Sequence, residues 1–175
     1  PWGGITNVDV AAYMRSIGLE GYAPIDWEEL NKVLRLMQAR KAVYNTRILS
    51  ISNNPYRRPQ GVYSCVSYQT LKDRFGIDNK VVNYDEFIVH LENIRNDASK
   101  QEKSKKLAKE LLNHAEKSNM DLAAVQKSVD FYLAVKELMN KYDCNAFTIK
   151  CFELCNSRIP ADYQITPCLV HSLLK

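Results

Sequence analysis

The hydrophobic positions recur at helical spacing over the first part of the chain. Capping residues and apolar positions predict one helix from Asn7 to Ile17 and another from about Trp27 to about Val43. A capping box precedes the second helix, in which Asp26 accepts from the Glu29 amide while the Glu29 carboxylate accepts from the Asp26 amide. We therefore expect residues 1–45 to be a helical segment from a preceding domain or a domain junction.

Beyond residue 45, three short apolar runs have the composition of β-strands. They are Thr46–Ser52, Lys80–Tyr84 and Ala146–Phe152. Helical patterns separate them and are long enough for crossovers, which predicts that all three are parallel strands of one sheet. We expect residues 46–175 to form an α/β domain with a Rossmann-like open parallel sheet and flanking helices. Because the final residues begin a helical pattern without a stop signal, this domain is expected to be truncated and to belong to a larger protein.

The helices between these strands carry recognisable start and stop signals. Ser67 is expected to cap a helix that stops at Gly76, Asp85 to start the next helix, and Asp121 to cap the last helix before the third strand. Periodicity also predicts a set of buried apolar residues, namely Leu111, Val125, Val129, Phe147 and Ile149.

Charge patterning restricts the classes of partner. The formal net charge is +4 with both signs mixed along the chain. The lysine-rich stretch 95–117 is either an exposed helix with one buried face or a basic patch; its apolar stripe favours the helix, with Lys103, Lys105 and Lys106 in solvent. We expect no nucleic-acid partner, and no membrane partner either, because no apolar run is long enough to span a bilayer.

The five cysteines form an odd, uneven set, which favours reduced thiols and a cytoplasmic location. Four residues could be ligands of a zinc ion, namely Cys151, Cys155, Cys168 and His171. Their spacing is C-x3-C, then twelve residues, then C-x2-H. A zinc-stabilised binding domain stays an alternative. The expected placement of Cys151 within a strand and Cys155 beyond its end instead favours ordinary thiols.

Open α/β sheets usually bind ligands just beyond the carboxyl ends of their strands. After the first strand, Arg57 and Arg58 are either part of a solvated loop or a phosphate clamp, although no glycine-rich cradle is present. After the third strand, Glu153 is either a residue that binds substrate or a residue that caps or turns the chain. Glu153 is our candidate substrate-binding residue, and no catalytic or metal-binding residue is assigned.

The segments 145–155 (NAFTIKCFELC) and 165–174 (ITPCLVHSLL) resemble a stretch of the fucose isomerase-like and arabinose isomerase families. The resemblance implies a central fragment of a metal-dependent aldose–ketose isomerase, which moves a proton between two carbons of a sugar substrate through an enediol. It implies Mn²⁺ in the full-length parent, held by carboxylates and a histidine beyond this sequence, and no cofactor in this fragment. It also implies a homo-oligomer.

The resemblance places Glu153 at the family's polar residue after the strand, which is often Gln and contacts sugar hydroxyls. A Glu at this position would make that contact charged. The fragment is expected to be inactive alone, and the alternative function is a non-catalytic α/β sugar-binding or interaction module.

Overall fold

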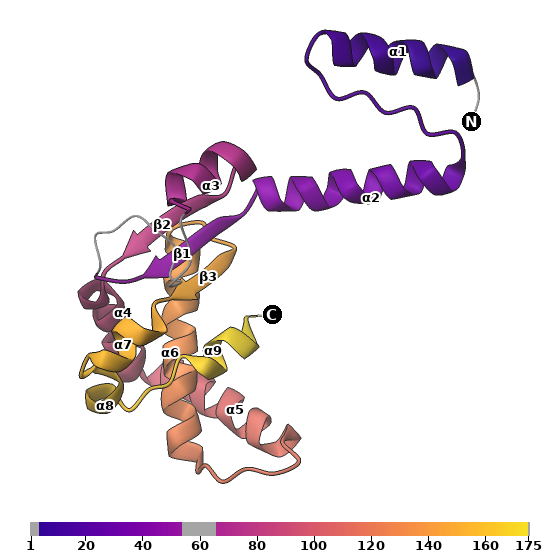
Figure 1. Ribbon diagram of the computed structural model, residues 1–175. Helices are drawn as coiled ribbons and strands as arrows, with labels where there is room; N and C mark the ends of the chain where they lie inside the picture. Colours follow the sequence, from indigo (N-terminus) through magenta and orange to yellow (C-terminus); the bar gives the residue numbers. More distant parts are fainter. Residues whose placement is uncertain (1–3, 54–65, 175) are drawn as a thin grey trace. The chain divides into compact units, whose positions relative to one another are not determined.

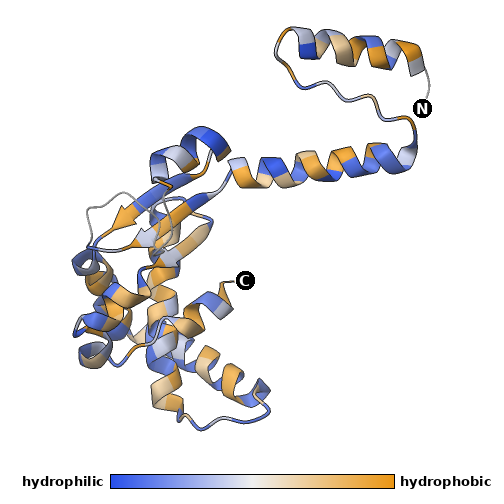
Figure 2. Ribbon diagram, in the orientation of Figure 1, coloured by the Kyte–Doolittle hydropathy of each residue, from blue (hydrophilic) through white to orange (hydrophobic). Residues whose placement is uncertain are grey.

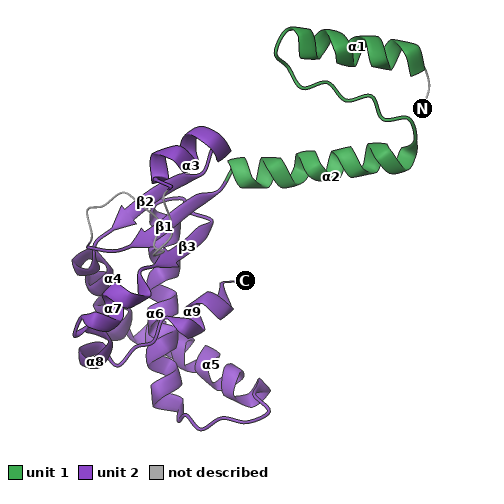
Figure 3. Ribbon diagram, in the orientation of Figure 1, with its two compact units in different colours: residues 1–45 green, residues 46–175 purple. Residues whose placement is uncertain are grey.

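The computed structural model describes residues 4–53 and 66–174, and the chain divides into two compact units. The first is Pro1–Asn45 and the second is Thr46–Lys175 (Figure 3).

The first unit contains two helices, α1 (Gly4–Ser16) and α2 (Trp27–Tyr44). The Asp26 side chain caps α2 by accepting from the Glu29 amide at 2.7 Å. The other half of the predicted capping box is wrong, because the Glu29 carboxylate accepts from the Ile25 amide instead. The predicted start of the first helix is also wrong, since Asn7 lies inside α1.

Two glycines shape the segment after α1. Gly18 has a φ of 79°, a left-handed conformation that ends the helix at little steric cost. Gly21 packs directly against the Ala11 backbone, where an added Cβ would lie 2.2 Å from the Ala11 carbonyl oxygen. The chain can therefore turn back along α1 only because position 21 has no side chain.

The second unit is built on three parallel strands, β1 (Arg47–Ile51), β2 (Asp78–Val82) and β3 (Ala146–Ile149). Their order is β2-β1-β3, so the first strand is central. The expectation of a single parallel sheet is confirmed, and no two of these strands form a hairpin. The unit is a mixed α/β structure, mostly helical, with a small open sheet.

The first strand is one residue shorter at each end than predicted, and the second begins two residues earlier, at Asp78. The second and third strands end two and three residues earlier than predicted. The third strand ends at Ile149 rather than Phe152, and the chain enters a short helix at Cys151. The second strand ends at Val82, because the Asn83 side chain accepts from the Glu86 amide at 2.8 Å and starts a helix at Tyr84. In both places helix formation overrides the β-favouring composition of the last strand residues.

Besides the sheet, the described part of the second unit contains seven helices (Figure 1). They are α3 (Tyr68–Phe75), α4 (Tyr84–Asn96), α5 (Ala98–His114), α6 (Leu122–Lys141), α7 (Cys151–Asn156), α8 (Ile159–Tyr163) and α9 (Cys168–Leu173). The predicted caps Ser67 and Asp121 are confirmed, and Gly76 ends α3 in the left-handed conformation. Asp85, which was expected to start the next helix, lies in the first turn of α4, one residue after its beginning at Tyr84.

The core lies between the sheet and helices α4 and α6, and hydrophobic residues dominate the middle of α6 (Figure 2). Phe87 of α4 and Phe131 of α6 meet edge to face with ring centroids 4.7 Å apart. Of the residues predicted to be buried, Val129 and Ile149 are confirmed. The other three, Leu111, Val125 and Phe147, are only partly buried.

The lysine-rich stretch forms α5, and its three lysines at 103, 105 and 106 are exposed as predicted. The buried side of α5 contributes Ser104 and Ala108. The charged composition of this stretch therefore belongs to the solvated face of an ordered helix. Among the described residues, no helix combines the length and apolar character needed to cross a membrane.

Candidate functional site

A polar cluster joins the carboxyl ends of the strands, with Glu153 at its centre. One carboxylate oxygen of Glu153 accepts from the Ser52 hydroxyl at 2.7 Å, and the other accepts from the Asn53 amide at 2.7 Å. Ser52 and Asn53 directly follow β1, whereas Glu153 lies beyond β3. The carboxylate thus connects two neighbouring strand ends, which parallel pairing places at the same edge of the sheet.

The end of β2 joins the same cluster through a side-chain amide. The Asn53 Oδ1 atom accepts from the Tyr84 backbone amide at 2.7 Å, at the start of α4. Asn53 therefore donates to Glu153 through its own backbone and accepts from Tyr84 through its side chain. We refer to Ser52, Asn53, Tyr84 and Glu153 as the strand-end cluster.

The position of Glu153 differs from the one predicted. It does not follow a strand directly but lies in the first turn of α7, and Lys150 occupies the N-cap position without a side-chain capping bond. Glu153 is therefore neither a cap nor a residue in a solvated loop. It is a partly buried carboxylate that reaches from a short helix to the end of the central strand.

Within the part of the chain that the structure describes, the carboxylate has acceptor positions that no residue occupies. An ionised carboxylate offers about four acceptor positions, and Ser52 and Asn53 occupy two. Because Glu153 is partly exposed, the remaining positions can accept from the hydroxyl groups of a ligand.

The hydroxyl of Tyr84 is the polar group of the cluster that has no partner. The residue is 2% exposed, and its hydroxyl makes no hydrogen bond with any residue that the structure describes. Burial raises the pKa of Tyr84, and the nearby groups of α7 raise it further, Glu153 more than Cys151 and Cys155. The phenol thus stays protonated and is a buried donor without an acceptor among the described residues.

The four residues tested for zinc have different surroundings from those expected. Cys151 and Cys155 lie one turn apart on α7, so the expected strand position of Cys151 is wrong. Burial raises the pKa of the Cys151 thiol, and Cys168 and Cys155 add to the effect. The His171 ring lies against Phe147, with centroids 5.1 Å apart. Within residues 4–53 and 66–174, no three His, Cys, Asp or Glu side chains are grouped so that they could hold a metal ion.

The other loop candidates cannot be placed. Arg57 and Arg58 lie outside the described residues, as does Cys65.

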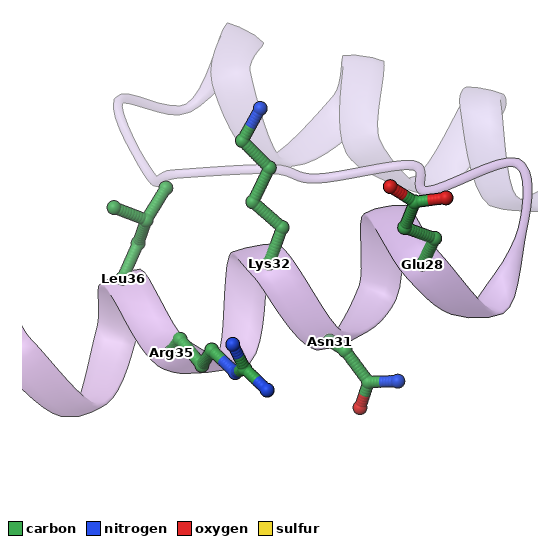
Figure 4. A pocket seen from close by; sticks show the side chains of 5 residues that line it. All are labelled: Glu28, Asn31, Lys32, Arg35 and Leu36. Atoms are coloured by element: carbon green, nitrogen blue, oxygen red, sulfur yellow. The ribbon is translucent and has the colours of Figure 1, made fainter.

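A separate hollow of about 740 Å³ lies along α2 in the first unit (Figure 4). Five residues line it, all from that helix: Glu28, Asn31, Lys32, Arg35 and Leu36. In Figure 4, the Asn31 and Arg35 side chains point away from the face that carries Lys32. The charged groups do not converge on one point, and this hollow gives no basis for assigning a ligand.

No protein-family model and no curated protein matches this chain.

Sequence reasoning found Glu153 and named the loop after the first strand, but it missed Tyr84. That residue was expected to end a strand rather than to start a helix. The signal that identifies it is Asn83, because a capping residue after a strand places the next side chain at the start of a helix and at the carboxyl edge of the sheet.

Proposed function

We propose that this chain forms a Rossmann-like sheet domain and one wall of the sugar pocket in a metal-dependent aldose–ketose isomerase of the fucose/arabinose type. The observation that supports the proposal most is the strand-end cluster. It unites a carboxylate, a hydroxyl and backbone amides at the sheet edge where α/β proteins bind small ligands.

The chemistry of the cluster suits a polyhydroxy compound. A sugar hydroxyl both donates and accepts, so it pairs with a carboxylate oxygen and with an O–H or N–H donor in the same place. Glu153 supplies the acceptor, and its hydrogen bonds to Ser52 and Asn53 fix its orientation before any ligand arrives. Such preorganisation reduces the entropy lost on binding.

The manganese ion implied by the resemblance does not fit the described residues of this chain. Glu153 stands without a second carboxylate or a histidine arranged around it there, and both of its oxygens already accept hydrogen bonds. We therefore derive no catalytic step through a metal from these residues. In the proposal, the groups that hold the ion and move the proton come from sequence beyond this chain.

A second function, a non-catalytic α/β sugar-binding or interaction module, has one observation in its favour. Glu153 links β1 to α7, which is what a purely structural carboxylate would do. The two functions differ in whether a longer protein containing this chain interconverts an aldose and a ketose.

Turnover measurements decide between them. With Mn²⁺ and either fucose or arabinose, the 175-residue chain alone should give no ketose, because one carboxylate cannot both hold the ion and transfer the proton. A longer protein that adds the family's metal-binding carboxylates and histidine should give ketose. Turnover by the chain alone would contradict the proposal, and an inactive longer protein would favour the binding module.

The Glu153→Gln variant tests the assigned role within an active longer protein. We expect sugar affinity to change several-fold while manganese affinity stays constant, since Glu153 contacts sugar hydroxyls in the proposal. Asp162→Asn, at an exposed position on α8, serves as the charge-matched control and should change neither affinity. Loss of manganese binding in Glu153→Gln would instead place Glu153 in the metal shell.

A further inference from the structure

Helix α2 has almost no buried surface among the residues that the structure describes. None of its 18 residues is buried there, and Leu30 and Val33 alone are partly buried. A lone helix of this length is marginal in water, and most helices in proteins are stabilised by packing of an apolar face. The apolar side chains of α2 therefore fit a helix that packs against a partner.

A stripe of five residues follows one face of α2. Its positions are 30, 34, 37, 41 and 44, and their alternating spacing of four and three residues is the heptad pattern of paired helices. The residues are Leu30, Leu34, Met37, Lys41 and Tyr44, and we refer to them as the α2 stripe. Leu34, Met37 and Tyr44 are 46%, 50% and 44% exposed. The stripe thus has the spacing of a coiled-coil seam, while most of its apolar side chains stay exposed.

A hollow on this stripe has the arrangement that receives a side chain from a second helix. It measures about 360 Å³, its lining is mostly apolar, and the residues around it are Met37, Arg40, Lys41 and Tyr44. These positions are i, i+3, i+4 and i+7, the set of four that forms the hole for one apolar side chain in knobs-into-holes packing. The Arg40 guanidinium lies over the Tyr44 ring, 5.3 Å from its centroid, and forms one side of the hollow. The hollow therefore fits an apolar side chain of a facing helix.

Charge determines which helix fits the stripe and in which direction. Glu28 and Glu29 lie in the first turn of α2, and Lys41 lies in the last turn. Arg40 pairs with Glu20 of the same chain, whereas Lys41 makes no ion pair with any described residue. A second copy of α2 in the antiparallel direction brings the acidic start of each helix to the basic end of the other, so the attraction occurs twice. A parallel copy would instead set Lys41 against Lys41.

We propose that α2 is a self-association surface, through which two copies of this chain pair with their α2 stripes antiparallel about a two-fold axis. At about 1.5 Å per residue, the 18 residues of α2 are about 27 Å long, so the contact is small for a permanent dimer and fits a reversible one. The inference uses no residue of the strand-end cluster and does not depend on the proposed function.

Sedimentation equilibrium of the 175-residue chain tests the surface. Across micromolar concentrations, the average mass of the wild type should rise from that of one chain toward that of two. Leu34→Glu should weaken the association about tenfold or more, because it places a charge in the apolar centre of the stripe. Met37→Glu should have the same effect. Both variants should remain folded by circular dichroism, because the buried core belongs to the other unit.

Leu36→Glu is the matched control. It makes the same substitution in the same helix, at a residue that is 62% exposed but lies outside the stripe, at the hollow of Figure 4. Its association constant should stay within about twofold of the wild-type value. A wild type that remains a monomer at all these concentrations would overturn the proposal. Equal association of Leu34→Glu and Leu36→Glu would overturn it as well, because the contact would then lie on another surface.

Lys41→Gln tests the antiparallel direction. The change removes the attraction to the acidic start of the other copy, so association should weaken about twofold to fivefold and become less sensitive to salt. In a parallel pair the same change would relieve a repulsion and strengthen association. Lys32→Gln is the control, because Lys32 lies outside the stripe and its loss should leave association unchanged. An association that is stronger or unchanged in Lys41→Gln would overturn the antiparallel pairing.

Discussion

Asp130 is the most deeply buried carboxylate among the described residues, at 3% exposure, and it ties three helices together. It accepts from Ser104 at 2.5 Å and from Gln101 at 3.0 Å on α5, and it pairs with Arg95 of α4 at 3.5 Å. Asp130→Ala leaves these polar groups without their acceptor. We expect a loss of about 3 kcal/mol in the free energy of unfolding, measured by urea denaturation.

The control for this change is Asp162→Ala, because the side chain of Asp162 is half exposed and its ion pair with Arg158 is long, at 3.8 Å. This control should cost no more than about 0.5 kcal/mol. Similar losses in the two variants would contradict the structural role assigned to the Asp130 network.

Glu86 makes the stability of the fold depend on pH. Hydrogen bonds from Lys141 at 2.7 Å and from Tyr142 at 2.5 Å hold the pKa of this carboxyl below its usual value of 4.5. Because the folded pKa is lower than the unfolded one, the ionised group stabilises the fold above pH 4.5, and this contribution is lost as the pH falls through the lowered folded value.

Glu86→Gln should therefore flatten the acid limb of the stability profile. The free energy of unfolding, measured between neutral pH and about pH 3, should fall less steeply in the variant than in the wild type. Parallel profiles would mean that the Glu86 carboxyl has the same affinity for protons in the folded and unfolded chains.

At the scale of elements, side-chain caps determine where the long helices begin. The Asp121 side chain accepts from the Ala124 amide at 2.7 Å at the start of α6, the helix that packs on both α4 and α5. Asp121→Ala should lower the free energy of unfolding by about 1 kcal/mol. Asp121→Asn keeps the accepting oxygen and should lower the free energy of unfolding much less. An equally large loss in Asp121→Asn would mean that the negative charge of Asp121, and not its capping hydrogen bond, stabilises α6.

Short elements were harder to predict than long ones. Caps and periodicity identified α2, α3 and α6 together with the positions of the three strands, because those signals are local. The boundary between β3 and α7 was missed by about three residues. Cys151 and Phe152 have strand-like composition, but the helix is selected by Leu154, which is fully buried in the core.

At the scale of the whole molecule, the two units differ in how much apolar surface they bury. The buried core cluster belongs entirely to the unit Thr46–Lys175. In the described part of the first unit, Ala11 is the only buried hydrophobic residue, and residues such as Ile5 and Trp27 are exposed. Burial of apolar area supplies most of the free energy of folding, so the second unit contains the means to fold by itself.

We therefore expect residues 46–175, expressed alone, to unfold in one cooperative thermal transition, followed by circular dichroism. Residues 1–45 alone should show no cooperative transition, because two helices with so little buried surface are marginal in water. A non-cooperative loss of structure in residues 46–175 would show that the first unit is required for the core.

The sequence by itself determined the local features of this protein. Ser67, Gly76 and Asp121 mark helix ends because a cap is a hydrogen bond or a backbone conformation within a few residues. The parallel sheet also followed from the sequence, since long helical segments between strands exclude hairpins.

Only the tertiary structure decided the composition of the candidate site. Glu153 meets Ser52 across 101 positions of the chain, and Asn53 meets Tyr84 across 31. Such contacts depend on strand order and on where each strand stops, and a shift of three residues at the end of β3 changes which side chain reaches the central strand. The unpaired Tyr84 hydroxyl is likewise a property of packing, because no local pattern reveals whether a buried donor has an acceptor.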